Sequence, residues 1–222
     1  MPPARRRPRG PGRPRADRAS GLDPEAIARA ALALIDREGL DDFSLRKLAA
    51  ALGCQPMSLY HHVPSKGALL DLVAAHLIAQ VRVPATGAWR PRLAAVARAY
   101  LGVAADHPRA AVLMVTRRFN LPSQLAFLEQ VLGLLRDSGL DAAHAAMAFR
   151  QLGFFLNGAA MALVSLRGEQ PDATPSAVDR IAPELPPRVA ASARYLAAPH
   201  FDAHVARGLE IVLDGIAALP RG

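Results

Sequence analysis

From Asp23 onward, apolar side chains recur at the spacing of an α-helix, and a chain with this pattern has few folds open to it other than helical ones. In the first such stretch, Ile27, Ala31 and Leu34 fall at positions i, i+4 and i+7 of one face. No stretch shows the sustained alternation of apolar and polar residues that is typical of a strand. The sequence therefore predicts an all-α protein, with helices over residues 24–38, 45–52, 56–62, 66–78, 89–106, 108–119, 122–138, 141–167, 187–198 and 200–219, and a Pro-rich loop at 168–187 that holds one helical turn near 178–181.

Several of the early helices carry start and stop signals. Asp23, Ser44 and Ser65 stand at N-cap positions, where a side-chain oxygen accepts hydrogen bonds from free backbone N–H groups. Gly39 and Gly53 follow the first two helices, where a positive φ angle ends a helix. We therefore expect a domain of three short helices and a connecting fourth over residues 21–82, and a second domain of longer helices over residues 83–222.

The first 20 residues have the composition of a disordered arm. Residues 1–18 hold seven arginines and one acid, Asp17, and so carry six of the eight net positive charges of the chain. A segment of Pro, Arg and Gly buries too little apolar surface to fold, and its charge favours nucleic acid. The run Gly12-Arg13-Pro14 resembles the core of an AT-hook, which enters an A·T minor groove. The simpler interpretation is an arm that binds phosphates of any sequence.

The rest of the composition is that of a soluble, cytoplasmic protein. Hydrophobic residues make up 51% of the chain, which predicts that most of it folds. Cys54 is the single cysteine, so no intrachain disulfide forms. The longest apolar run, residues 152–166, is interrupted by Asn157 and is shorter than the roughly 20 residues that span a bilayer. The basic N-terminus is not followed by the apolar stretch of a signal peptide, and we expect no membrane association.

Residues 45–62, LRKLAAALGCQPMSLYHH, have the spacing of a helix-turn-helix. Ala49 is small where two helices would cross, Gly53 suits the sharp turn, and Leu59 would lock the second helix from inside. In this motif the second helix enters the major groove of DNA. A generic pair of helices has a similar spacing, so the outward-facing residues must distinguish the two.

Those outward-facing residues favour DNA. With Leu59 in the core, the second helix presents hydrogen-bonding and apolar groups that suit base edges and thymine methyl groups. Flanking cations suit phosphates; a solvated helix face is the alternative for Arg46 and Lys47, and for Lys47 it is an equally simple explanation. The predicted DNA contacts are Arg46, Lys47, Gln55, Met57, Ser58, Tyr60, His61, His62 and Lys66.

Residues 22–73 resemble the DNA-binding domain of the TetR family of bacterial regulators. The features that carry the resemblance are, in chain order, Gly39, Leu48-Ala49, Gly53, Leu59-Tyr60-x-His62-Val63 and Lys66. The resemblance implies a homodimer that binds double-stranded DNA at a palindromic operator, and it implies the same contacts as above apart from Lys47. Cys54 stands where the family commonly has an aliphatic residue, which implies a small packed thiol rather than a redox sensor.

Residues 83–222 resemble the tetracycline-repressor branch of that family more weakly. The resemblance rests on the helix at Trp89, on His107-Pro108, on Phe127 and Gly133, and on the last helix with Phe201, Gly208-Leu209 and Gly215. It implies that residues 141–167 and 200–219 of each subunit form a four-helix dimer interface. Leu209, Ile211, Val212 and Ile216 would supply its apolar seam, but one helical face is equally compatible with the core of a single chain.

A small-molecule site is expected within the second domain. Pockets are mostly apolar with a few polar groups, and polar or aromatic residues interrupt the apolar faces here. For each of them ordinary core or surface is the alternative. The candidates are His107, Arg117, Asn120, Phe127, Gln151, Phe154, Phe155 and Asn157.

Two further patterns bear on which ligands the chain takes. Tetracycline-binding members have a histidine near the end of the fourth helix, where this chain reads Ala79-Gln80-Val81-Arg82, which argues against tetracycline and its metal chelate. His200 and His204 have the i, i+4 spacing of a zinc pair, but no third ligand completes the set. We therefore predict neither a metal site nor a cofactor.

Together these features predict a sequence-specific DNA-binding transcriptional repressor that a small-molecule effector releases from its operator. An enzyme is the second class considered, and the sequence lacks the GxSxG, HExxH, phosphate-loop and dinucleotide-binding patterns. A ligand-independent architectural DNA-binding protein is the third. It would explain the arginine arm but would leave residues 83–222 without a role.

Overall fold

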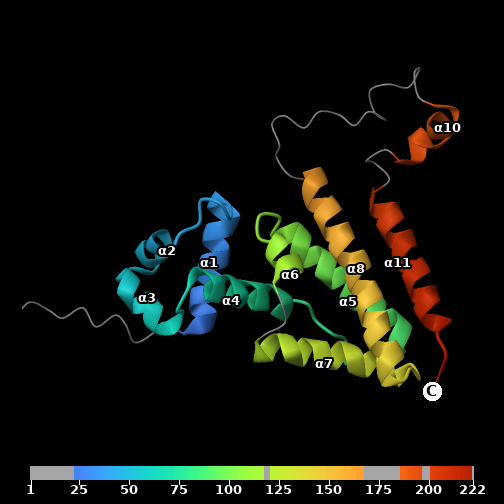
Figure 1. Cartoon of the computed structure of the whole chain (residues 1–222), viewed down its shortest axis with the longest axis horizontal. Helices are drawn as coiled ribbons and strands as arrows, with labels where there is room; N and C mark the ends of the chain where they lie inside the picture. Colours follow the sequence, from blue (N-terminus) through green and yellow to red (C-terminus); the bar gives the residue numbers. More distant parts are fainter. Residues whose placement is uncertain (1–22, 118–120, 168–185, 197–200, 222) are drawn as a thin grey trace, which may run out of the picture.

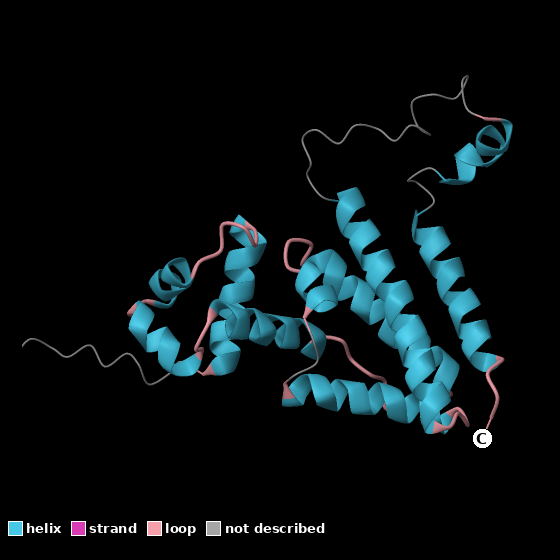
Figure 2. Ribbon diagram, viewed as in Figure 1, coloured by secondary structure: helices cyan, strands magenta, loops and turns pink. Residues whose placement is uncertain are grey.

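The computed structural model describes residues 23–117, 121–167, 186–196 and 201–221, and every regular element within them is an α-helix (Figures 1 and 2). The prediction of an all-α fold is thereby confirmed. The helices are α1 (Pro24–Glu38), α2 (Leu45–Leu52), α3 (Pro56–His62), α4 (Lys66–Ala79), α5 (Trp89–Asp106), α6 (Val112–Thr116), α7 (Pro122–Asp137), α8 (Ala142–Arg167), α10 (Pro187–Leu196) and α11 (Phe201–Ala217).

The start signals act as the sequence predicts. The carboxylate of Asp23 accepts from the N–H of Ala26 at 2.6 Å, and the hydroxyl of Ser65 accepts from the N–H of Ala68 at 3.1 Å. Ser44 caps α2 in the same way, with 3.3 Å to the N–H of Lys47. Each bond satisfies a donor that the first turn of a helix leaves free.

The chain turns sharply after α2, at Gly53. Gly53 adopts φ 66°, a left-handed conformation, and its N–H returns to the carbonyl groups of Ala49 and Ala50. No atom lies within 4 Å of the position that a Cβ would occupy, so a side chain would meet strain but no clash. The tight turn therefore depends on the backbone of glycine alone.

Gly53→Ala should lower the free energy of unfolding by about 1 kcal/mol, because a Cβ disfavours the left-handed conformation. Gly102→Ala is the matched control, since Gly102 lies inside α5 with equally free space. There alanine favours the helix, and we expect about 0.5–1 kcal/mol of stabilisation. Urea titration measures both changes. Equal effects of the two substitutions would contradict this account of the turn.

Two sets of packed helices follow each other along the chain. In Figure 1, α1 to α3 lie at one end of the molecule, whereas α8 and α11 run side by side at the other. Helix α8 contacts α5, α6, α7 and α11, and helix α4 contacts α1, α6 and α7. Among the helix pairs, α4 therefore makes the main contacts between the first set and the second.

Helix α8 is also the one described helix that is long and apolar enough to cross a membrane by length and composition. It packs against four other helices, and Ala145, Ala148, Leu152 and Leu156 belong to the core. A core helix of a water-soluble protein passes the same test of composition, so this helix does not indicate a membrane.

The largest departure from the predicted helices is at α6. The sequence predicts a helix over 108–119, but α6 begins only at Val112, because the carbonyl of His107 accepts from both Ala110 and Ala111 and closes a turn first. The end of that prediction, the predicted helical turn at 178–181 and the arm at 1–20 lie outside the described residues.

The apolar face of α11 is mostly core, which corrects part of the predicted dimer seam. Leu209 and Ile216, both named for the seam, are 4% and 3% exposed and lie on the same face as the fully buried Leu213. The spacing of these residues, i, i+4 and i+7, turns them toward α8 and α5. Ile211 is 61% exposed and Val212 is partly exposed, so these are the two of the four predicted seam residues that remain open to a partner subunit.

Candidate nucleic-acid interface and ligand cavity

Helix α3 is held against α2 by a small apolar contact. Leu48, Ala49 and Leu59 are each at most 1% exposed, and Leu59 is the only buried residue of α3. Ala49 is buried in the core on α2, which contacts α3, as expected for a small residue in the helix-turn-helix. Cys54 lies partly buried against the same core, as expected for a packed thiol.

The remainder of α3 faces away from the core. Met57 is 69% exposed and Tyr60 is 46% exposed. Gln55, His61 and His62 are also exposed, whereas Ser58 is partly exposed. The helix therefore presents an amide, a thioether, a phenol and two imidazoles on a short rigid element, which are groups that suit base edges and phosphates.

The flanking cations differ in how far they are engaged within the chain. Lys47 donates to the carbonyl of Asp42 at 2.9 Å and lies 3.0 Å from the carboxylate of Glu38. Hydrogen bonds from Arg37 and Lys47 lower the pKa of the partly exposed Glu38. Arg46 is exposed and has no ion-pair partner among the described residues.

Lys66 has a structural role that the sequence does not reveal. Its ammonium group donates to the carbonyl of Phe43 at 3.0 Å and lies 5.7 Å from the centroid of the Phe43 ring. Phe43 is 2% exposed and directly precedes the cap of α2. Lys66, the first residue of α4, therefore fixes the segment that leads into the helix-turn-helix.

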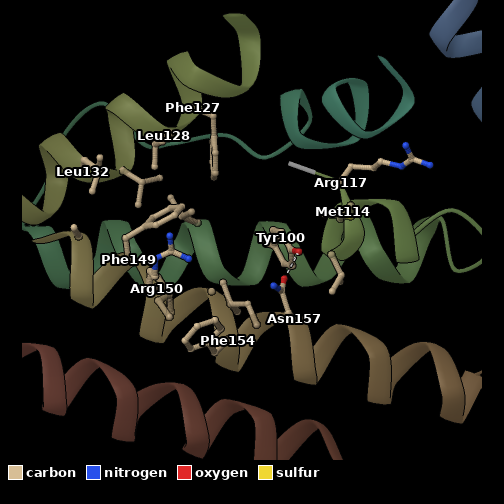
Figure 3. Close-up of a pocket in the computed structure, with 17 residues that line it drawn as sticks. Tyr100, Met114, Arg117, Phe127, Leu128, Leu132, Phe149, Arg150, Phe154 and Asn157 are labelled. Atoms are coloured by element: carbon tan, nitrogen blue, oxygen red, sulfur yellow. Dashed lines mark hydrogen bonds between the residues drawn. The ribbon is translucent and has the colours of Figure 1, made fainter. Parts of the chain in front are cut away.

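A second feature is a cavity of about 410 Å³ among α5, α6, α7 and α8 (Figure 3). Its walls are mainly aliphatic and aromatic, the usual composition of a small-molecule site. The lining residues are Val96, Tyr100, Met114, Val115, Arg117, Phe127, Leu128, Val131, Leu132, Ala146, Phe149, Arg150, Leu152, Gly153, Phe154, Leu156 and Asn157.

The polar groups of the cavity are few and separated. The hydroxyl of Tyr100 donates to Oδ1 of Asn157 at 2.7 Å, and burial raises the pKa of Tyr100 to about 12, so the phenol stays neutral. Figure 3 shows Arg150 beside Phe149 at one end of the cavity and Arg117 at the other. Arg117 donates to the carboxylate of Asp71 on α4 at 3.3 Å.

Four of the candidate ligand contacts come together in this cavity: Arg117, Phe127, Phe154 and Asn157. His107, Gln151 and Phe155 do not line it, and Asn120 lies outside the described residues. The sequence analysis missed Tyr100, Met114, Phe149 and Arg150, which read as ordinary residues of helical faces. The spacing of Phe149, Gly153 and Asn157 at i, i+4 and i+8 is a signal that would have placed them on one face of α8.

The three candidates outside the cavity have other contacts. His107 lies 2.7 Å from the carboxylate of Asp36 on α1, whose second oxygen is buried without a hydrogen-bond partner in the described residues. Arg109 donates to the carbonyl of Arg37 at 2.6 Å. These bonds fasten the segment after α5 to the end of α1.

Gln151 and Phe155 line an outer groove between α8 and α11 instead. Its other lining residues include Met147, Phe154 and Val212. Phe154 is 62% exposed and Met147 is 43% exposed, so the groove presents large apolar side chains to its surroundings. His204 lies on α11, His200 lies outside the described residues, and the described part of the chain has no group of three residues able to hold a metal.

Comparison with known families gives two matches that together cover most of the chain. Residues 27–73 match the family model described as bacterial regulatory proteins, tetR family. Residues 83–219 match the model described as tetracyclin repressor-like, C-terminal domain.

Individual relatives extend over nearly the whole chain. The HTH-type transcriptional repressor DrrR1 of Streptomyces coeruleorubidus is 32% identical over 211 residues, covering 88% of this chain and 77% of the relative. The class A tetracycline repressor of Escherichia coli is 32% identical over 203 residues, covering 88% and 91%.

Solved structures show the same arrangement of helices. Apo ActR from Streptomyces coelicolor superimposes with a TM-score of 0.78 at 29% identity, covering 89% of this chain and 95% of ActR. ActR in complex with actinorhodin gives a TM-score of 0.78 at 28% identity, covering 89% and 99%.

Proposed function

This chain belongs to the TetR family of bacterial regulatory proteins, and on that premise we propose that it binds a palindromic operator as a homodimer and leaves it when a small molecule fills the cavity. It is a DNA-binding transcriptional repressor that responds to an effector. The observation that carries the proposal is the exposed face of α3, a helix with one buried residue, Leu59. Members of the family are regulators rather than enzymes, and we propose no catalytic activity here.

On the DNA side, α3 enters the major groove. Gln55, Met57, Ser58, Tyr60 and His61 read base edges, and Tyr60 also reaches phosphates. The phosphate contacts are Arg46, Lys47, His62 and Lys66. Arg46 is available to bind a phosphate. Lys47 and Lys66 must first break their hydrogen bonds to backbone carbonyl groups of the chain.

On the effector side, the cavity lies among α5 to α8, and α4 connects it with the DNA-binding helices. Arg117 supports this coupling, because it lines the cavity and pairs with Asp71 of α4. A ligand that prefers one position of α4 shifts the population of dimers toward one spacing of the two α3 helices. Its effect on operator affinity is at most the ratio of its affinities for the two states.

The domain boundaries follow from the same assignment. We propose a DNA-binding domain over residues 21–82 and an effector-binding and dimerisation domain over residues 83–222, with residues 1–20 as an arm that adds phosphate contacts. Soluble regulators of this family are typically cytoplasmic, and we place this chain in the cytoplasm.

Selection of random duplexes by the purified chain tests the operator. We expect a palindrome whose half-site centres lie about 34–36 Å apart, one helical turn, because two α3 helices must enter the same face of the DNA. Fluorescence anisotropy should then show a preference of about 10³ or more over scrambled DNA of equal composition.

The matched control is the chain without residues 1–20. It should select the same palindrome with a smaller dependence of affinity on salt, since the arm contributes phosphate contacts. Equal binding of selected and scrambled DNA by the shortened chain would refute a sequence-specific regulator and favour the architectural alternative.

A further inference from the structure

We propose that the effector is an aromatic anion whose acidic group pairs with Arg150 at one end of the cavity. The inference rests on the proposed role of the cavity as the effector site and adds the chemical class of the ligand. Three properties of the lining carry it: the aromatic walls, the sign of the charge, and the kind of polar group present.

The walls are suited to flat rings. Phe127 comes from α7, Phe149 and Phe154 come from α8, and Tyr100 comes from α5, so aromatic side chains approach the cavity from three helices (Figure 3). Aromatic rings favour offset or edge-to-face contacts with other rings beyond the gain from buried area. A cavity of about 410 Å³ has room for a ligand of a few fused rings.

The charge of the lining is positive. Among the described residues, the lining has two arginines, Arg117 and Arg150, and no carboxylate. Asp71 already offsets the charge of Arg117. Arg150 has no such counter-ion within the described ranges, which leaves its guanidinium group beside an apolar cavity. This arrangement disfavours a cationic ligand and favours an anion, since guanidinium matches a carboxylate with two parallel hydrogen bonds.

The neutral polar groups have the same preference. The proton of the Tyr100 hydroxyl is spent on Oδ1 of Asn157, so the donors that this pair still offers to a ligand are the amide N–H groups of Asn157. The guanidinium group of Arg150 has donors only. A ligand that satisfies both carries acceptor oxygens, which a carboxylate or phenolate supplies and an ammonium group does not.

The test compares 9-anthracenecarboxylate with the neutral 9-anthracenecarboxamide, both fluorescent and nearly equal in shape, in titrations of the full chain. We expect the carboxylate to bind about tenfold more tightly, with a preference that weakens as salt rises. Arg150→Gln should abolish the preference while the affinity for the carboxamide stays, which shows that the variant is folded. Arg98→Gln removes an exposed charge of α5 outside the cavity and should leave the preference intact.

Three results would overturn the proposal: equal binding of the two probes, a preference that survives in Arg150→Gln, or binding of neither probe. Operator binding, measured on the same preparations, separates these results from failure of the proposed function. A chain that selects a palindrome but binds both probes equally remains an effector-responsive repressor with a neutral ligand. A chain that selects no palindrome fails the proposed function whichever probe it prefers.

Discussion

Ile211→Asp should convert the homodimer into monomers and weaken operator binding with it. Ile211 is 61% exposed in the single chain, so the substitution disturbs little of the core. It shares a face of α11 with Gly215, which has no atom within 4 Å of the position that a Cβ would occupy, so a second helix can approach closely there. A carboxylate buried there without a partner would weaken the dimer at least roughly 100-fold.

Leu125→Asp is the matched control for this substitution. Leu125 is also a large apolar residue, 50% exposed, but it lies on α7 and outside the groove between α8 and α11. Sedimentation velocity over a range of concentrations measures both variants, and circular dichroism shows whether they are folded. A dimer that survives Ile211→Asp, or one that Leu125→Asp also breaks, would mean that another face joins the subunits.

The first four helices could be predicted almost to the residue because their limits depend on local chemistry. A capping side chain such as Ser44 acts within three residues of its own position, and Gly53 acts through its own φ angle. Signals of this kind need no knowledge of the rest of the fold. The same locality made the helix-turn-helix readable in one stretch of sequence.

Helix α6 shows where local signals become insufficient. The apolar pattern of residues 108–119 suits a single helix, but the carbonyl of His107 closes a turn and the side chain of His107 pairs with Asp36, which is 71 positions earlier. Contacts with a distant part of the chain decide where α6 begins. Periodicity contains no information about them.

The apolar face of α11 illustrates a different limit. Periodicity showed that Leu209 and Ile216 share a face, and the structure shows that their own chain covers it. A pattern of apolar residues shows that a face is buried, but it does not reveal which surface covers that face. Ile211, which lies off that face, is the member of the predicted seam that remains most exposed.

Only some of the residues that line the candidate cavity could be predicted from the sequence, because an apolar pattern does not show which helices come together. Polar residues that interrupt an apolar face, such as Arg117 and Asn157, stand out in the sequence. Tyr100 and Phe149 belong to ordinary apolar faces, and only the approach of α5, α7 and α8 makes them walls of one site. On the DNA side, Lys66 stands out as a cation, yet its contact with Phe43 spans 23 positions.

Tyr60→Ala should weaken operator binding by at least about 30-fold and leave the dimer intact. Tyr60 is 46% exposed on α3, so its ring contributes little to the core. One good side-chain contact to DNA is worth about 1–3 kcal/mol. Because a homodimer makes each contact twice on a palindrome, the loss counts in both half-sites. Anisotropy with the selected operator measures the affinity, and sedimentation velocity confirms the dimer.

Tyr195→Ala is the matched control, since Tyr195 is 52% exposed on α10, at the end of the molecule opposite α3 (Figure 1). Its affinity for the operator should equal that of the unaltered chain. A Tyr60→Ala dimer that binds the operator as tightly as the unaltered chain would reject α3 as the recognition helix. A loss of binding that is the same on scrambled DNA would instead assign Tyr60 to the phosphates, because a base contact lowers affinity for the operator alone.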